Sequence, residues 1–541
     1  MKKFNILLLL LVTSLLMFNS CIEETFPEGS TATSEQIGAS ASALEASLNG
    51  IPSQMTQGYY VYDDQVHETD MSYPQFMIAQ TEMLGDMYPL GDNSGYDWYR
   101  NYNTFNGAFG ENSYFAYLPW FTLYKLIKSA NDVIAAVDIE DESLPQSILG
   151  AAGIAYANRA FNYYMLTVFF EPVENIYTDV SKVIGLTVPF VTETTTGDDA
   201  KNNPRATHDA MIEFILSDLD KAESLMEDYT PKSKLFPGLA VVYGIKAKVY
   251  LWDEQYDKAA EFARKAIATF SGSPITESQW DDPVTGFNTV NQAWMWYATY
   301  SAENMENLAN FTGWMSPEAD WGYSPLSKPG IDRSLYDKIA ETDFRKRTFL
   351  HPDKLEYYNY KTVRGEDFIN DAPAYLSIKF RPVAGNWETY SIGGVSDIPI
   401  MRVEEMYFIE AEASGLAQGV GAGVAKLNSF MQSYRQPDYN FTTGDQRALQ
   451  LEILAQMRIE FWGEGNAFPS AKRIKPDIIQ NYEGTNAPGD IFKINMKGIK
   501  PNWNLVIPID EMEANVALEG LNNPDPTATV TGPTPVGTFA N

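Results

Sequence analysis

Residues 243–267 carry the pattern that most restricts the fold of this chain, because helical periodicity coincides there with a regular series of small side chains. Small side chains let two helix backbones approach closely, and residues 253–256 supply a polar turn between the two halves of the stretch. We therefore predict an antiparallel helix pair. The positions that carry the pattern are Ala247, Tyr250, Tyr256, Ala259, Ala263 and Ala266.

The spacing of these small and aromatic residues resembles a tetratricopeptide repeat. Further helices are predicted by apolar residues at intervals of three and four, at about 34–55, 117–137, 146–169, 207–226, 401–418, 423–434 and 454–461. Short strands are predicted at 375–381 and 504–508, and residues 59–112 are predicted to be mostly loop. The expected fold is mainly α, with tetratricopeptide-like helix pairs, a loop-rich ligand-binding portion and a few short strands.

Residues 271–400 differ in composition from the helical segments. They are rich in Gly, Asn, Pro and Asp, and many of the tryptophans of the chain lie among them. We expect long loops that grow out of one helical unit. Its N-terminal half, with the helix pairs, is placed at 44–270, and its C-terminal half, with the loop-rich insertion, at 271–541.

The N-terminus has the features of a secretory signal. Lys2 and Lys3 precede an apolar run at 6–18, which is well short of the ~20 residues that a membrane-spanning helix needs. The run ends close to Cys21, the single cysteine of the chain. Residues 1–20 are therefore predicted to be a signal peptide. Residues 21–43 are predicted to be a lipid-bearing start and a flexible tether rich in Ser, Thr, Gly and Ala.

A cysteine at the end of a signal peptide resembles the lipobox of bacterial lipoproteins, in which the thiol is acylated. The resemblance implies an acyl chain such as palmitate on Cys21, which would hold the protein to a membrane. Phe18 stands where the lipobox usually has Leu. An ordinary signal peptide that happens to include a cysteine is the alternative. Glu23 and Glu24 resemble the acidic signal of lipoproteins displayed on the outer surface.

Charge and cysteine content exclude some functions. The chain has 71 acidic and 39 basic residues, for a net charge of −32. Such a chain repels phosphate backbones and lacks the main source of affinity for nucleic acid. No disulfide can form within a chain that has one cysteine, so a large hydrophobic core must provide the stability.

Several segments, in order, resemble the SusD/RagB family of outer-membrane nutrient-binding lipoproteins. The N-terminal half supplies RAFNYYMLTVFFEPV at 159–173 and the helix pair at 236–267. DIPIMRVEEMYFIEAEA at 397–413 resembles the strand and Glu-Ala helix of the family, and QMRIEFWGEGNAF at 456–468 resembles its Arg-x-Glu-x-x-x-Glu-Gly motif. VIPIDEMEANVALEGLNNP at 506–524 resembles its Pro-Ile-Pro ending.

This resemblance implies a receptor without catalytic activity, lipid-anchored in the outer membrane and facing the exterior. It implies that the protein caps a SusC-type, TonB-dependent β-barrel and passes it oligosaccharide or polysaccharide, or peptide in the RagB branch. The chain departs from the family after Gly465, where Asn466, Pro469 and Ser470 replace the usual Arg and Asp. The departure puts a local ion-pair network in question, but not the fold.

A sugar-binding site needs flat apolar rings for the C–H faces of a pyranose and polar groups for its hydroxyls. Residues 91–105 offer both kinds of group, and the later insertion adds aromatic rings. The resemblance places the binding face of the family on loops of these two regions. For each tryptophan, the alternative is a gap-filling role in the core. The predicted ligand-binding residues are Trp98, Asn101, Trp296, Trp321, Arg100 and Tyr323.

Catalytic interpretations have less support in the sequence. His67, His208 and His351 are far apart and lack zinc-ligand spacing, so we predict ordinary surface or loop histidines. A glycoside hydrolase needs only two carboxylates in a cleft, and a chain this acidic leaves that alternative open. Glu460 and Glu464 lie one helical turn apart, and we predict that they tie their helix into the scaffold.

Two further alternatives concern metal and protein partners. No cofactor is predicted, although oxygen-rich loops could hold Ca²⁺ without the spacing of a twelve-residue calcium loop. The candidates for such a loop are Asp92, Asn93, Asp97, Asp281 and Asp282. A pure adhesin or scaffold, which would use the groove of the helix pairs for protein contact, is the third class of function.

Overall fold

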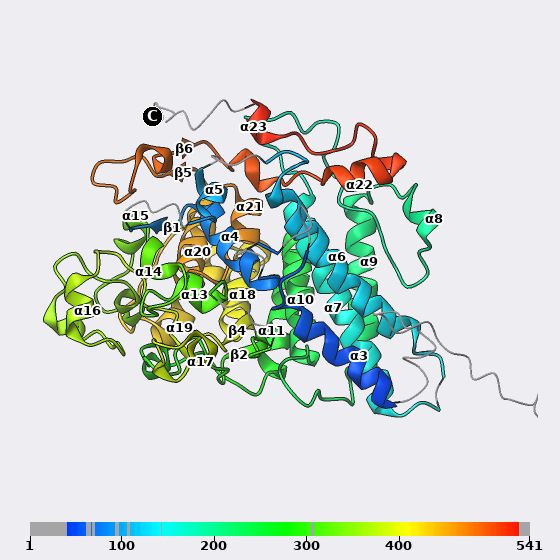
Figure 1. The fold of residues 1–541 in the computed structure, drawn as a ribbon, viewed down its shortest axis with the longest axis horizontal. Coiled ribbons are helices and arrows are strands. Elements are labelled where there is room, and N and C mark those ends of the chain that lie inside the picture. The colour runs from blue at the N-terminus through cyan, green and yellow to red at the C-terminus, as the bar shows by residue number, and fades with distance from the viewer. Residues whose placement is uncertain are drawn as a thin grey trace, which may run out of the picture.

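The structure is a computed structural model that describes residues 41–60, 66–67, 71–91, 97–104, 109–141, 143–303 and 308–529. Helices joined by long loops make up most of this part of the chain, and the strands are few and short (Figure 1). The predicted mainly helical class is confirmed. The predicted signal peptide and Cys21 lie outside the described residues. None of the described helices is both long enough and apolar enough to span a membrane.

A row of packed helices forms the scaffold (Figure 1). Helix α7 (Gln146–Phe170) is its centre, because every side chain from Gly150 to Phe170 is buried. Arg159 of α7 donates from Nε to Asp218 Oδ2 at 2.7 Å and so links α7 to its neighbour α9. In packing order the row comprises α3 (Ala41–Gln54), α6 (Tyr114–Ala135), α7, α9 (His208–Met226), α10 (Leu239–Trp252), α11 (Tyr256–Thr269) and α18 (Val403–Ala417), with α19 (Val420–Tyr434) and α20 (Gln446–Glu460) against α18.

The helix pair predicted at 243–267 is α10 and α11, with the turn where it was expected. The residues that α11 buries are all alanines, namely Ala259, Ala260, Ala263 and Ala266. Their short side chains let α11 lie close to both α10 and α18. The second predicted pair, at 401–418 and 423–434, corresponds to α18 and α19, so this part of the sequence-based prediction is confirmed.

Helix α4 (Tyr73–Leu84) lies where a loop was predicted. All twelve of its residues are buried, so its sequence has no polar face and shows no helical period. It ends at Gly85, whose φ of 76° is a left-handed conformation that favours glycine. The loop prediction for this segment was wrong because tertiary burial on all sides removes the periodic signal.

The predicted strands were also wrong. Leu376 and Ser377 form only isolated bridges, and residues 504–508 have no regular structure. Three antiparallel pairs occur instead among the described residues. They are β1 (Met87–Pro89) with β3 (Pro329–Ile331), β2 (Trp294–Thr299) with β4 (Asp397–Arg402), and β5 (Ile478–Ile479) with β6 (Asn495–Met496). The β2–β4 pair closes the loop-rich insertion at its base, so residues 300–396 leave the scaffold and return to it side by side.

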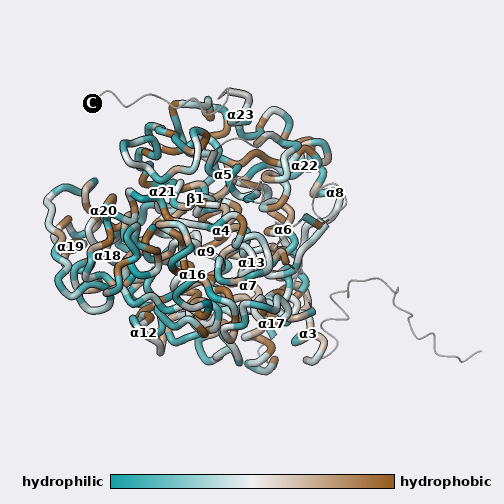
Figure 2. The backbone as a smooth tube through the Cα atoms, turned by 60° about the vertical axis from the view of Figure 1, so that its left-hand side comes forward, coloured by the Kyte–Doolittle hydropathy of each residue, from teal (hydrophilic) through white to brown (hydrophobic). Residues whose placement is uncertain are grey.

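One hydrophobic core joins the two halves of the chain. Its buried members run from Leu44 to Leu518 and include both helix pairs and the β2–β4 sheet. Figure 2 likewise shows hydrophobic residues spread along the whole described backbone. Short helices of the insertion pack on this core, namely α12 (Glu277–Trp280), α13 (Phe311–Met315) and α15 (Arg333–Tyr336). The insertion also contains α14 (Ser324–Ser327), α17 (Tyr390–Gly393) and α16 (Glu366–Asp371), whose Ile369 belongs to a separate small cluster.

Candidate functional site

Trp98 is the most exposed tryptophan of the chain. Nine of the eleven tryptophans are buried, whereas 47% of the surface of Trp98 is exposed. It lies just before the short helix α5 (Arg100–Thr104), which carries the half-buried Arg100 and Asn101. The core role that the sequence left as an alternative therefore does not apply to Trp98.

Aromatic contacts join this segment to the insertion. The buried Tyr99 meets Trp314 of α13 edge-on, with ring centroids 5.3 Å apart. Tyr323 stacks on Trp314 at 4.4 Å and stays half-buried. The backbone N–H of Gly91 donates to Ser327 O at 2.9 Å, which links the start of the same segment to α14. The two regions that were expected to share a binding face are thus brought together.

Trp321 lies beneath this surface, with 7% of its area exposed. Glycines flank its indole: a Cβ on Gly393 would lie 3.1 Å from Trp321 Cζ2, and one on Gly313 would lie 3.4 Å from Cζ3. Two residues without side chains thus let the ring fill the space between α13 and α17. In this conformation Trp321 supports the surface rather than offering it a ring face.

Trp296 is a core residue, which corrects the prediction that its ring faces a ligand. It is fully buried in β2, its ring contacts Phe161 of α7 at 4.9 Å, and its Nε1 donates to Leu235 O at 3.1 Å. Its ring and its polar edge are therefore used inside the protein.

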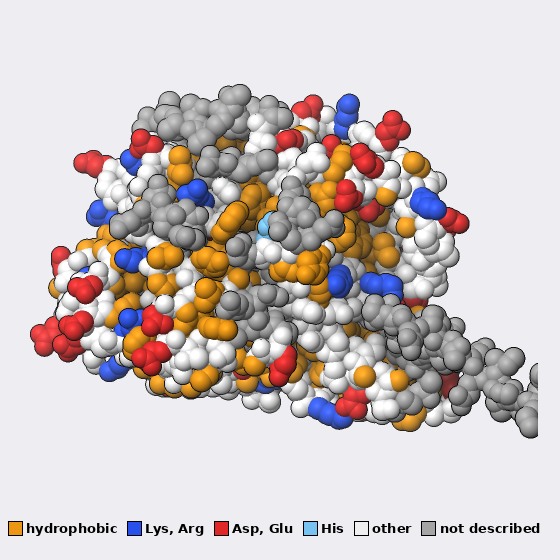
Figure 3. Space-filling model, in the orientation of Figure 1, with side chains coloured by type: hydrophobic (Ala, Val, Ile, Leu, Met, Phe, Trp, Pro, Cys, Tyr) orange, Lys and Arg blue, Asp and Glu red, His pale blue; other side chains and the backbone are white. Residues whose placement is uncertain are grey.

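The structure adds exposed residues that the sequence did not indicate. Tyr390 and Ile392 of α17 are 39% and 48% exposed, and Leu326 of α14 is exposed as well. The guanidinium carbon of Arg364 lies 4.0 Å above the ring of Trp387. Figure 3 shows hydrophobic side chains at many places on the face of the molecule that is turned to the viewer in Figure 1. We call Trp98, Tyr323, Leu326, Trp387, Tyr390 and Ile392 the aromatic face.

Of these added residues, only Trp387 had a sequence signal, as a tryptophan in a Gly- and Asn-rich loop. The others sit on helices of four residues, which are too short to show a period.

A titratable carboxyl group stands next to Trp98. Burial raises the pKa of Asp97 to about 6, although Arg100 and the backbone N–H groups of Tyr99 and Arg100 oppose the rise. Burial, together with the charge of Asp97, also raises the pKa of Glu82 at the end of α4. The carboxyl group beside the most exposed ring of the face therefore changes charge near neutral pH.

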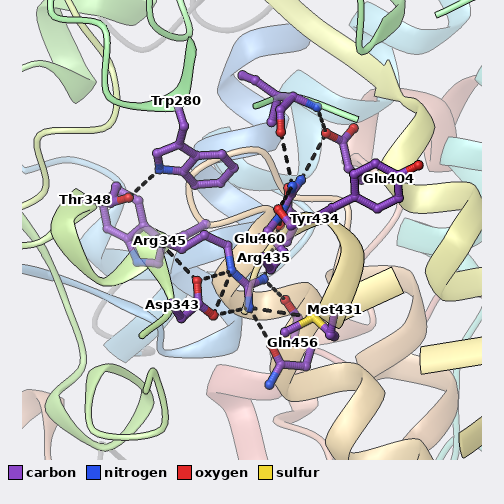
Figure 4. Close-up of polar contacts among 12 residues, drawn as sticks. Trp280, Asp343, Arg345, Thr348, Glu404, Met431, Tyr434, Arg435, Gln456 and Glu460 are labelled. Atoms are coloured by element: carbon purple, nitrogen blue, oxygen red, sulfur yellow. Dashed lines mark hydrogen bonds and ion pairs between the residues drawn. The ribbon is translucent and has the colours of Figure 1, made fainter. Parts of the chain in front are cut away.

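The acids of the Arg-x-Glu-x-x-x-Glu-Gly segment are structural. Arg345 and Arg435 bind the carboxylate of Glu460 at 3.1 and 2.7 Å (Figure 4). Arg402 binds the same carboxylate at 3.0 Å. Burial acts to raise the pKa of Glu460, but the three guanidinium groups have the larger effect. The pKa of Glu460 is therefore lower than its ordinary value. Glu464 is likewise buried and pairs with Lys379 at 2.6 Å.

The prediction that Glu460 and Glu464 tie their helix into the scaffold is confirmed. They do not form a pair of acids in an open cleft, as a glycoside hydrolase would need. Asn466, at the departure from the family motif, donates to Glu405 Oε2 at 3.2 Å and thus joins the neighbouring ion pair of Glu405 with Lys248.

Metal ligands do not converge in the part of the chain that the structure describes, where no group of three or more His, Cys, Asp or Glu could hold an ion. Asp281 pairs with Arg347, and Asp282 accepts the N–H of Val284 at 2.8 Å. Two of the Ca²⁺ candidates, Asp92 and Asn93, lie outside the described residues.

His208 differs from the predicted ordinary histidine. It begins α9 between two carboxylates, with Nδ1 2.7 Å from Glu171 and Nε2 3.0 Å from Asp253. The hydrogen bond and charge of Glu171, with a contribution from Asp253, raise the pKa of His208 to about 9. The imidazolium form therefore links the C-terminal ends of α7 and α10 to the start of α9.

Comparison with known proteins finds SusD-like matches both in sequence and in fold. A SusD-like family model, described as starch-binding and associating with the outer membrane, matches residues 53–251. The SusD-like protein P38 of Formosa agariphila is 31% identical over 173 residues, which are 31% of this chain. The N-terminal half of the chain is therefore SusD-like in sequence. The aligned part spans only 29% of the length of P38.

Several solved structures share the fold of this chain over most of its length. A SusD-like carbohydrate-binding protein from Bacteroides vulgatus superposes with a TM-score of 0.69 at 20% identity, over 89% of this chain and 98% of its own. Surface glycan-binding protein A from Bacteroides thetaiotaomicron, solved in complex with laminarihexaose, superposes with a TM-score of 0.61 at 15% identity, over 89% and 99%. Identities this low establish the shared fold alone.

Proposed function

We propose that this SusD-like chain binds oligosaccharide or polysaccharide at the cell surface, with the aromatic face as its ligand site. The observation that carries the proposal is the exposure of Trp98 next to Tyr99, which contacts Trp314 and through it the half-buried Tyr323. Burying a ring of this kind against the C–H face of a sugar is favourable, whereas leaving it in water serves no purpose in the fold. The laminarihexaose complex of a protein with the same fold supports the choice of ligand.

Binding at this face needs no chemical step. Trp98 supplies the apolar platform, and Asn101 and Arg100 lie within the next turn of chain to hydrogen-bond hydroxyl groups. A neutral glycan has no net charge, so the acidity of the chain does not oppose its approach. The protein captures and releases its ligand without making or breaking a bond.

The proposal includes a place in the cell and a partner. An acyl chain on Cys21 holds the protein to the outer membrane with the aromatic face toward the exterior, and a SusC-type TonB-dependent barrel receives the ligand. The description of the matching family model as associating with the outer membrane supports this placement. A RagB-like receptor for peptides, with the same architecture, is the alternative.

Binding assays with the protein lacking residues 1–21 test the ligand. Laminarihexaose, maltohexaose and a mixed peptide digest are titrated separately by calorimetry, and the sugars are recovered and checked for cleavage. Saturable binding of an intact sugar is the expected result. Saturable binding of peptides alone would establish the RagB-like alternative, and release of shorter sugars would establish a hydrolase. Co-purification of the full-length protein with an outer-membrane barrel tests the partner.

A further inference from the structure

A second cleft, remote in sequence from the aromatic face, collects positive charge in an otherwise acidic protein. It has a volume of about 650 Å³ and lies between α20, β5 and the residues that follow β6. Figure 1 shows α15, α20, β5 and β6 in the same part of the molecule. We call it the basic cleft. Its charged lining residues are Lys338, Arg447, Arg458, Lys475 and Lys497 on the positive side and Glu174 and Asp477 on the negative side.

Two of these cations are neutralised within the protein. Arg458 donates from Nε to both oxygens of the buried Asp86, each at 3.0 Å. Lys497 pairs with Asp477 at 2.8 Å. These pairs leave Lys338, Arg447 and Lys475 as the other cations of the lining, and Glu174 as its other carboxylate.

The remaining three cations have no carboxylate partner in the part of the chain that the structure describes. Arg447 donates to two backbone carbonyls, Ile474 O and Lys475 O, the latter at 2.9 Å, so its charge is oriented but not cancelled. Lys338 and Lys475 form no ion pair there. An oriented guanidinium beside two free ammonium groups is an arrangement that favours an oxyanion.

The charges that face Lys338 come from several elements. Partial burial and the charge of Arg458 lower its pKa, while Glu452, Asp86 and Asp332 act in the opposite direction. None of these three carboxylates forms an ion pair with Lys338 among the described residues, so its exposed ammonium group can still bind a negatively charged partner.

The walls of the cleft add apolar surface next to these cations. Leu451 of α20, Ile479 of β5 and Ile176 after α7 all line it and are exposed to solvent. A volume of about 650 Å³ lies within the range of small-molecule sites, which is roughly 300–1,000 Å³. The ligand that matches is therefore one with an oxyanion at one end and an apolar face along its body.

We propose that the basic cleft is a second binding site, which takes a sugar that carries an oxyanion group. Lys338, Arg447 and Lys475 hold the carboxylate, sulfate or phosphate, and Leu451 and Ile479 cover the C–H face of the ring. The oxyanion follows from the charges of the cleft, whereas the choice of a sugar rests on the proposed glycan-binding function. The site shares no residue with the aromatic face.

A double variant tests the proposal. Lys338→Gln combined with Lys475→Asn removes the two free ammonium groups, and Asn tolerates the left-handed backbone of Lys475, whose φ is 55°. Lys128→Gln combined with Lys258→Gln is the matched control for net charge, because both lysines are exposed and more than 40 residues from any residue of the cleft lining. The probes are trigalacturonate, glucose 6-sulfate, glucose 6-phosphate, uncharged maltotriose, an acidic peptide and inorganic sulfate, each titrated at low salt.

We expect at least one charged sugar to bind the wild type and the control variant with equal affinity. The same sugar should bind the double variant at least tenfold more weakly. The proposal would be overturned if the double variant bound the charged sugars as tightly as the wild type does. It would also be overturned if no charged sugar bound to any of the proteins. So would inorganic sulfate or the acidic peptide binding as tightly as the sugars. Trp98→Ala should leave charged-sugar binding unchanged, so a failure of the aromatic face is told apart from a failure of the basic cleft.

Discussion

The loop-rich insertion contributes to two regions with opposite character, the ion-pair cluster around Glu460 and the aromatic face around Trp98. In the cluster, Arg345 is fully buried and bound to Glu460 and Asp343. In the face, Tyr390 and Ile392 are left in solvent. Charged groups thus lie inside and apolar groups outside, the reverse of the usual distribution.

The two regions have different roles, because the ion-pair cluster anchors the insertion and the aromatic face is available for recognition. Buried charges need partners of fixed geometry, so the contact of Arg345 with Glu460 binds the insertion to α20 in one arrangement. Exposed rings need no internal partner and remain available to a ligand. We therefore expect stability to depend on the ion-pair cluster and ligand affinity to depend on the aromatic face.

The largest effect is expected for Glu460→Ala. The substitution leaves three buried guanidinium groups without their shared carboxylate, and breaking a buried pair costs about 3–5 kcal/mol, so we expect the upper end of that range. Urea unfolding of both proteins measures the loss. Glu366→Ala, at an exposed acid of α16, is the control and should leave the free energy of unfolding unchanged. Equal stability of the two variants would mean that the cluster does not anchor the insertion.

Trp296→Ala should cause the second-largest loss in the free energy of unfolding. Removing a fully buried indole between β2 and α7 costs about 3–4 kcal/mol through lost contacts and the cavity that remains. Molecules that remain folded should bind glycan with wild-type affinity, because the ring does not reach the surface. A selective loss of glycan affinity at unchanged stability would return Trp296 to the binding site.

Trp98 and Trp296 also show how far the sequence could predict the candidate site. Both belong to segments rich in Gly, Asn or aromatic residues, and both were equally good candidates for a sugar platform. What separates them is the β2–β4 pairing, which places Trp296 over Phe161 and depends on residues about 100 positions apart. Exposure is a tertiary property, and no local pattern contains it.

The same distinction applies to the fold. The pair α10–α11 was predictable because its small residues follow a local helical period, whereas the uniformly buried α4 shows none. The structural role of Glu460 was predictable from its helix and motif. Its partners Arg345 and Arg402 were not, since they come from distant segments that only the folded chain brings together.

Trp98→Ala tests the aromatic face directly. If Trp98 anchors the sugar, the substitution should weaken binding by about 2 kcal/mol, roughly thirtyfold, because central aromatic anchors dominate binding energy. Stability should barely change, since the ring is largely exposed. Phe121→Ala, at an exposed ring on α6, is the matched control and should bind glycan as the wild type does. Unchanged affinity in a folded Trp98→Ala protein would remove Trp98 from the site.

The smallest effect concerns pH and the scaffold. The pKa of His208 rises to about 9 in the folded protein, mainly through its hydrogen bond with Glu171, against about 6.5 when unfolded. A raised histidine pKa adds stability that is complete below about pH 6.5 and is lost as the pH rises through about 9. Because the side chain is one-quarter exposed, we expect about 1–2 kcal/mol rather than the full shift.

Other buried groups titrate in the same window, so the wild type alone cannot isolate His208. Burial lowers the pKa of Lys472 and of Lys500 to about 7, and each therefore adds stability as the pH rises from about 7 toward the unfolded value of about 10.5. The difference in unfolding free energy between the wild type and His208→Gln cancels these lysines. That difference should be about 1–2 kcal/mol at pH 6 and close to zero at pH 10. An equal difference at pH 6 and pH 10 would show that the ion pairs of His208 do not stabilise the helical scaffold. Glycan affinity at the aromatic face is the control, and it should be the same in both proteins at either pH.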